Sequence, residues 1–410
     1  MLSFPGASRF CIRMLYRELL QSELIRQRDE FVDFARAQED ELKGYLRLLE
    51  DLLSAPPGRL AEFSEPGSGA VPSREFEDGR TLAVPFSETW SNHEQARAWA
   101  SEVLSGRTTF AADGSQLFPG KEVSIPVAAI QVGWFENPHD TGAKYSRDAE
   151  FRLLGPGELL KGDEEPFDPE TRVGEERFLA EARCVAGFLE RKRGWEERGE
   201  RMPLAFFDGT LLVSFSLPKS RLQKGFIEAM EALVQLSGEC RVPVVGYIDR
   251  SLARDILNLL DAYGGREAPS DRTLVDASFL HGTGSLAGWG ERTKFFHSNR
   301  RGLEQFSGLS GGGAGTGFIY LSTAGGSSPA RLDVPDWIFE AGLLDDVADV
   351  VRAECVVGLG YPYPLETADA TALISAKDRQ VFLKALQDFA LREKLDFSVS
   401  RKNTSKGRRR

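Results

Sequence analysis

An alternation of strand-like and helix-like segments between residues 107 and 248 constrains the fold most strongly. Three stretches rich in β-forming residues come first, and two amphipathic helical patterns then alternate with two short apolar strands. The predicted order is β-β-β-α-β-α-β, over Arg107–Asp113, Val123–Phe135, Glu150–Leu154, Val173–Arg193, Pro203–Phe207, Arg221–Leu236 and Val242–Ile248.

This order is the one shown by an RNase H-like core, in which an antiparallel meander leads into parallel strands through helical crossovers. The sequence therefore predicts an α/β fold, with an RNase H-like mixed sheet flanked by helices. Beyond this core, we expect helices over Ser251–Ala262, Asp271–Leu280 and Ile338–Val351, and a strand over Phe318–Ser322.

The N-terminal region has a different pattern, because apolar residues recur at helical spacing between Phe10 and Leu53. One or two long amphipathic helices are predicted there, suited to docking or to homodimer formation. Pro, Gly and Ser residues then indicate a break. The predicted organisation is an N-terminal helical segment over 1–55, a linker and loop region over 56–106, a main domain over 107–395, and a basic, disordered tail over 396–410.

Composition narrows the class of protein. The net charge of −11 speaks against a protein that coats nucleic acid through a uniformly positive surface, although a local basic strip can still follow phosphates. No apolar run is long enough to span a membrane, and no signal peptide is recognisable, so a cytoplasmic protein is expected. Four scattered cysteines argue against a zinc site or a disulfide framework.

Two aspartates follow strand-like runs in a matching context. Asp113 precedes Gly114 and Ser115, and Asp208 precedes Gly209 and Thr210. A single Asp-Gly pair is ordinarily a turn. Two copies at the ends of buried strands instead favour a divalent cation site, because carboxylate oxygens suit Mg²⁺ and Mn²⁺. Such cations assist phosphodiester hydrolysis by stabilising charge and activating water.

Three motifs together resemble those of the NurA nucleases, and they occur in the same order. They are Ala112–Gln116, Phe207–Leu211, and Gly360–Leu365 with the following Asp369. The resemblance extends from about Arg107 to the helix after the last motif. It implies an RNase H-like fold and manganese-dependent cleavage of DNA, as a single-strand endonuclease and 5′-to-3′ exonuclease. It also implies a role in DNA end resection, together with a hexameric HerA-type ATPase.

The resemblance implies that Asp113 and Asp208 are metal ligands and that a glutamate of the intervening helix is the third. Glu181 is favoured over Glu190, because it lies in the early turns and near the apolar side of that helix. A solvated helix glutamate is the alternative for either residue.

The last motif supplies further candidates. Tyr361 is expected to position water or phosphate, or else only to pack a proline-rich turn. Asp369 stands where the family often has a histidine, and it would complete the metal shell as a fourth carboxylate, which leaves the general base open. Asp249 is a secondary candidate that also suits the N-cap region of a helix.

Contacts with the DNA backbone require cations near the acidic centre. The candidates are Arg250, Arg254, Lys294, Arg300 and Arg301.

Two other functions compete with a metal-dependent DNA nuclease. One is a non-catalytic subunit that docks a DNA motor ATPase, with structural carboxylates. The other is an RNase H-like enzyme acting on RNA or hybrids. The glycine-rich stretch Gly308–Gly317 lacks the Gly-Lys-Ser/Thr ending of a phosphate-binding loop, so ATP hydrolysis is assigned to a partner.

Overall fold

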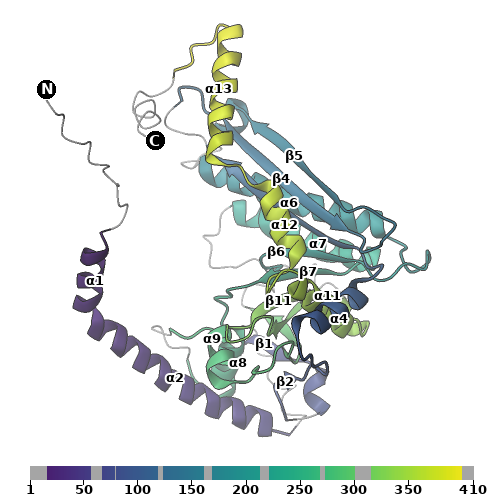
Figure 1. The fold of residues 1–410 in the computed structure, drawn as a ribbon. Helices are drawn as coiled ribbons and strands as arrows, with labels where there is room; N and C mark the ends of the chain where they lie inside the picture. The colour runs from purple at the N-terminus through teal and green to yellow at the C-terminus, as the bar shows by residue number, and fades with distance from the viewer. Residues whose placement is uncertain are drawn as a thin grey trace, which may run out of the picture.

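The computed structural model describes residues 16–56, 67–78, 80–118, 123–160, 169–212, 221–267, 273–300 and 315–398. Within these residues the chain forms a mixed sheet of eleven strands, with helices on both faces (Figure 1). The strands are β1 (Gly69–Pro72), β2 (Ala83–Val84), β3 (Thr109–Leu117), β4 (Ala128–Asn137), β5 (Ser146–Leu154), β6 (Leu204–Asp208), β7 (Val244–Ile248), β8 (Arg292–Thr293), β9 (Phe296–Asn299), β10 (Thr316–Leu321) and β11 (Ala330–Pro335).

The predicted RNase H-like core is confirmed. Strands β3, β4 and β5 form an antiparallel meander, β6 lies parallel to β3, and β7 lies parallel to β6. The sheet continues from β7 through β11, β10 and β9 to β1, with antiparallel neighbours throughout. The core is therefore extended well beyond the strands that the sequence pattern predicted.

Helices cover the sheet and extend from it. α6 and α12 contact opposite faces of the β3–β4 region, α7 packs beside α6, and α4 packs against α11. The helical elements are α1 (Arg17–Arg26), α2 (Arg28–Ser54), the 3-10 helix η1 (Arg74–Asp78), α4 (His93–Leu104), α5 (Pro156–Leu159), α6 (Pro169–Lys192), α7 (Arg221–Cys240), α8 (Asp255–Tyr263), α9 (Asp276–Thr283), α10 (Asp336–Glu340), α11 (Leu344–Val357), α12 (Tyr363–Ala372) and α13 (Ala376–Arg392).

The structure differs from the expectation at residues 56–106. The described part of this segment is not only linker and loop, because it provides β1, β2, η1 and α4. Its strands are short and its composition is rich in Pro, Gly and Ser, so their formation depends on pairing with distant strands.

Two hydrophobic cores divide the buried side chains. The larger core lies between the central strands and α6, α7 and α11. The smaller core joins the C-terminal part of α2 to α8, α9 and the β1–β9–β10 side of the sheet. The N-terminal helical segment is confirmed: α1 and the first part of α2 project from the body (Figure 1) and carry exposed apolar side chains. None of the helices in the described ranges is long and apolar enough to cross a membrane.

Candidate metal centre

Asp113 and Asp208 are neighbours at the end of a strand. β6 ends at Asp208, whereas the parallel strand β3 continues past that level to Leu117. The register pairs Ala112 with Phe207, so the next residue of each strand is an aspartate, and both aspartates point to the same face of the sheet. The sequence placed Asp113 at the end of its strand, but it lies within β3, and it is the end of β6 that defines the site.

α12 brings Asp369 to this face. Asp113 pairs with Gly133 of β4, and a Cβ atom at Gly133 would lie 2.5 Å from the Ala372 nitrogen. The bare glycine thus lets α12 lie directly on the sheet. Asp369 lies against Asp113, and both a hydrogen bond and charge repulsion between these carboxyls act to raise the pKa of Asp113.

Glu181 approaches from the opposite face, which is covered by α6. Its carboxylate lies where a side chain at Gly114 would project, and Glu181 is only 6% exposed. One turn earlier on the helix, Arg177 Nη1 lies 2.5 Å from Glu181 Oε1 and 4.0 Å from Asp113 Oδ1. It also donates a hydrogen bond to the Gly114 carbonyl oxygen at 3.1 Å. Arg177 therefore connects the carboxylates of the two faces.

Tyr361 does more than pack a turn. Its hydroxyl donates to Asp208 Oδ1 at 3.4 Å, and its ring meets the edge of Tyr247 at a centroid distance of 5.2 Å. Tyr247 is in turn the register partner of Asp208 on β7. The tyrosine is thus anchored on the neighbouring strand, with its hydroxyl directed at the aspartate.

The negative charges of this cluster exceed the positive charge that lies among them, and the pKa values of three of its carboxyls are raised. Burial raises the pKa of Asp113 to about 6, with Asp208 and Asp369 adding to the rise and the Gly114 amide opposing it. Burial likewise raises the pKa of Glu181 to about 7, against the opposing charge of Arg177. Asp208 is more exposed, yet partial loss of hydration and the charge of Asp369 still raise its pKa. The ionised cluster is therefore costly unless a cation joins it.

The donor set suits a hard divalent cation, because it consists of carboxylate oxygens with a tyrosine hydroxyl beside them. As the side chains lie here, no three acidic, histidine or cysteine residues of the described ranges converge tightly enough to enclose an ion. The ion pair between Glu181 and Arg177 explains part of this spread. Release of Glu181 from the arginine would free its oxygens for a cation.

Two secondary candidates lie apart from the carboxylates. Glu190 is exposed on the same helix, two to three turns beyond Glu181, and its charge acts on Cys240. Asp249 is closer, because its charge contributes to the raised pKa of Tyr361. It does not cap α8, whose N-cap residue is Arg254.

The predicted DNA-backbone contacts are only partly compatible with the structure. Arg250 and Arg254 are exposed, as a phosphate contact requires. The prediction that Lys294 contacts DNA was wrong, because this residue is only 6% exposed and its ammonium lies 5.1 Å from the centre of the Phe76 ring. The prediction for Arg300 was also wrong, because its guanidinium is paired with the buried Asp255. Arg301 lies outside the described residues.

Arg177, a cation that lies among these carboxylates, was not among the residues predicted from the sequence. A signal was present, because Arg177 and Glu181 have the i,i+4 spacing of helical ion pairs. That spacing is common on solvated helix faces, so it could not single out this pair. Among the described cysteines, Cys184 is partly buried, and Cys240 and Cys355 are buried.

Comparison with known proteins identifies the family. The sequence model of the NurA domain matches residues 107–374, which is well over half of the chain. No curated protein matches the chain. Similar solved structures include NurA with manganese, at 10% identity and a TM-score of 0.38, covering 86% of this chain and 98% of that one. Another is NurA bound to dAMP and manganese, at 12% identity and a TM-score of 0.34, covering 69% and 88%. By the domain match, the chain belongs to the NurA family.

Proposed function

We propose that this protein is a metal-dependent DNA nuclease with Mn²⁺, or alternatively Mg²⁺, as its cofactor. The observation that carries the proposal is that Asp113, Asp208 and Asp369 lie near the end of β6, close enough for their charges to raise the pKa values of Asp113 and Asp208, and that Glu181 approaches from the other face. Burial without enough positive charge raises the pKa values of the first two residues and of Glu181. Membership of the NurA family supports the same reading.

The four carboxylates would hold the cation, which supplies Lewis-acid stabilisation of the negative charge that develops on the phosphate. Tyr361 is placed to orient water or a phosphate oxygen beside Asp208, through the hydroxyl that it directs there. Arg177 pairs with Glu181, and it would be available to a phosphate oxygen of DNA if Glu181 held the cation instead. Arg250 and Arg254 are the exposed cations assigned to the DNA backbone.

Membership of the NurA family supports a more specific proposal. We assign the protein single-strand endonuclease and 5′-to-3′ exonuclease activity in DNA end resection and repair, as a cytoplasmic homodimer with a HerA-type hexameric ATPase. The exposed apolar side chains of α1 and α2 support a docking or dimerisation role for that segment.

The test is cleavage of end-labelled single-stranded DNA, duplex DNA, RNA and RNA–DNA hybrid with Mn²⁺, Mg²⁺ or EDTA. We expect metal-dependent cutting of DNA, and the sizes of the 5′-labelled and 3′-labelled products give the polarity. Asp113→Ala and Asp208→Ala should each lower the rate by about 1000-fold, which corresponds to roughly 4 kcal/mol of barrier.

Glu181→Gln and Glu190→Gln form a matched pair on one helix, of which only the first should impair cutting. No cutting by folded wild-type protein, even with the ATPase and ATP, would favour the non-catalytic docking subunit. Preferential cutting of RNA or hybrid would favour the RNase H-like alternative.

A further inference from the structure

The turn that follows Asp208 is bound to a residue two strands away. The Thr210 hydroxyl and the Leu211 amide both donate hydrogen bonds to Asp333 Oδ2, the amide at 3.2 Å. Asp333 lies on β11 and is fully buried. The buried Asp333 carboxylate therefore holds the side chain and backbone of the short turn that begins at Asp208, a candidate metal ligand.

A glycine explains how Asp333 can reach this turn. The register places Phe207, Gly246 and Asp333 in one row across β6, β7 and β11. Gly246 has no side chain, and a Cβ atom there would lie 2.5 Å from the Gly209 carbonyl oxygen. The turn thus folds over the bare backbone of β7, where the carboxylate of β11 meets it.

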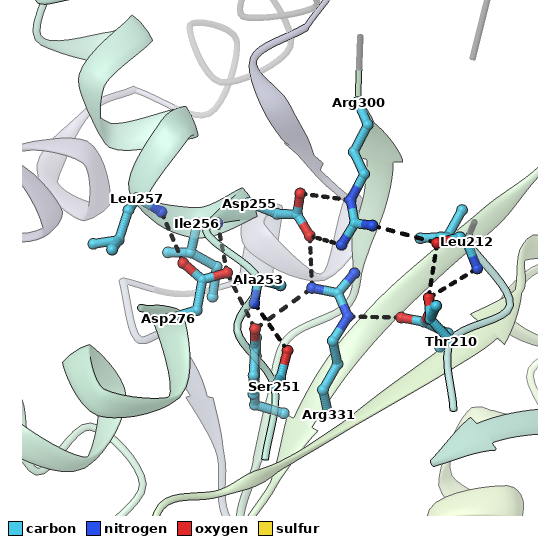
Figure 2. A network of polar contacts seen from close by, with 12 residues as sticks. Thr210, Leu212, Ser251, Ala253, Asp255, Ile256, Leu257, Asp276, Arg300 and Arg331 are labelled. Carbon is cyan, nitrogen blue, oxygen red and sulfur yellow. Dashed lines mark hydrogen bonds and ion pairs between the residues drawn. The ribbon is translucent and has the colours of Figure 1, made fainter. Parts of the chain in front are cut away.

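The orientation of Asp333 is itself fixed. Arg331 Nε donates to Asp333 Oδ1 at 2.7 Å, so one carboxylate oxygen binds the arginine and the other binds the turn. Arg331 Nη1 also donates to Asp255 Oδ2 at 2.6 Å, and Asp255 is paired with Arg300. Figure 2 shows this chain of contacts running from the first turn of α8 to Thr210. The carboxylate therefore has little freedom to follow the turn if the turn moves.

We propose that Asp333 is a positioning residue, which acts through Thr210 and Leu211 to fix the turn that orients Asp208. It acts through the turn, because one of its carboxylate oxygens binds Arg331 and the other binds Thr210 and Leu211. Its contribution is to hold the Asp208 carboxylate beside Asp113 and Tyr361. The link to metal binding rests on the proposed function, whereas the control of the turn does not.

The test uses Thr210→Val, which removes the hydroxyl donor but keeps the shape, and Thr210→Ser, which restores the donor. Asp333→Asn is a second variant that keeps an acceptor but loses the charge. Tyr45→Phe is the matched control, because it removes a hydrogen bond to Asp261 in the smaller core, away from the turn.

Three readouts are measured on the full chain: hydrogen exchange of the peptide covering residues 206–212, Mn²⁺ affinity by electron paramagnetic resonance, and the Mn²⁺ concentration that gives half-maximal DNA cleavage. Thr210→Val and Asp333→Asn should speed exchange of the turn and weaken both Mn²⁺ readouts by about three- to tenfold. Thr210→Ser and Tyr45→Phe should match wild type in all three.

Wild-type Mn²⁺ affinity in both Thr210→Val and Asp333→Asn would overturn the positioning role. So would an equal loss in Tyr45→Phe, because a general loss of stability would then explain the effect. Wild-type protein that binds Mn²⁺ but cuts no DNA would overturn the proposed function alone, since the exchange and affinity readouts would still decide this inference. Wild-type protein that binds no Mn²⁺ would overturn the proposed function and the link to metal binding, and hydrogen exchange of residues 206–212 would then decide whether Asp333 controls the turn.

Discussion

Two clusters of acidic side chains lie in this molecule, and they differ in how their charge is balanced. In the network of Figure 2, two arginines, Arg300 and Arg331, meet Asp255 and Asp333. Burial acts to raise the pKa of Asp255, but the two arginines outweigh it and hold that pKa below its ordinary value. Asp276 accepts hydrogen bonds from the Ile256 and Leu257 amides and the Tyr320 hydroxyl, and burial raises its pKa to about 7 against the opposing charge of Arg331.

At the candidate metal centre, by contrast, the negative charge of the carboxylates exceeds the positive charge beside them. Arg177 is the cation that the structure places among four carboxylates, and the pKa values of Asp113, Glu181 and Asp208 are raised. Burial of acidic groups alone does not distinguish a structural network from a functional site. What distinguishes them here is whether the protein itself supplies the compensating positive charge.

Removal of the key arginine from each cluster should have unequal effects on folding. Arg331→Met removes the ion-pair partner of the buried Asp333 and one of the two arginines on the buried Asp255, so we expect a loss of about 3–5 kcal/mol in the free energy of unfolding. Arg177→Met should cost on the order of 1 kcal/mol, because its partner Glu181 can take up a proton. Urea denaturation at pH 7 in EDTA measures both, and similar losses would remove the distinction between the clusters.

Addition of Mn²⁺ should stabilise the protein through one cluster only. At 100 times the dissociation constant, the free energy of unfolding should rise by about 2.7 kcal/mol. Asp113→Asn should abolish this gain, whereas Tyr45→Phe should retain it. Thermal unfolding with and without Mn²⁺ tests this, and a gain that survives in Asp113→Asn would place the cation elsewhere.

Glu181→Gln should stabilise the metal-free protein at high pH. The pKa of Glu181 is raised to about 7, so the folded chain binds a proton more tightly than the unfolded chain. Ionisation of Glu181 therefore disfavours folding above pH 7, and this cost fades as the pH falls toward 4.5. The gain from Glu181→Gln should be roughly 2 kcal/mol larger at pH 8 than at pH 5, because one pKa unit is about 1.4 kcal/mol. A gain independent of pH would contradict the raised pKa.

The smallest effect is expected in the smaller core, at the hydrogen bond between Tyr45 and Asp261. Tyr45→Phe removes the hydrogen bond from its hydroxyl to Asp261 Oδ1, at 3.0 Å, and should cost about 1 kcal/mol of stability. Cleavage and Mn²⁺ dependence should not change. An altered Mn²⁺ dependence would show that the two clusters are coupled through the smaller core.

Local patterns in the sequence predicted much of the core. The alternation of residues 107–248 gave β3 to β7 and the two crossover helices, because each is long or apolar enough to define itself. Strands β1, β8 and β9 were not predicted, because they are two to four residues long and exist through pairing with distant strands.

The candidate site residues that belong to a sequence motif could be predicted from the sequence. Asp113, Asp208, Tyr361 and Asp369 lie near one another in the structure, and Glu181 approaches them from the face that α6 covers. Asp333 gave no local signal, because its relation to Asp208 depends on the order of strands in the sheet and on the bare backbone of Gly246. The prediction that Lys294 and Arg300 contact DNA was wrong, because the burial and ion pairing that keep a cation from a phosphate cannot be read from the sequence.

Mn²⁺ binding to the carboxylates at the end of β6 is best tested by electron paramagnetic resonance on wild-type protein, Asp113→Asn, Asp208→Asn and Glu190→Gln. We expect wild type and Glu190→Gln to bind Mn²⁺, and each aspartate variant to lose at least tenfold in affinity. Equal affinity in all four proteins would contradict the assignment of the cation to the carboxylates at the end of β6.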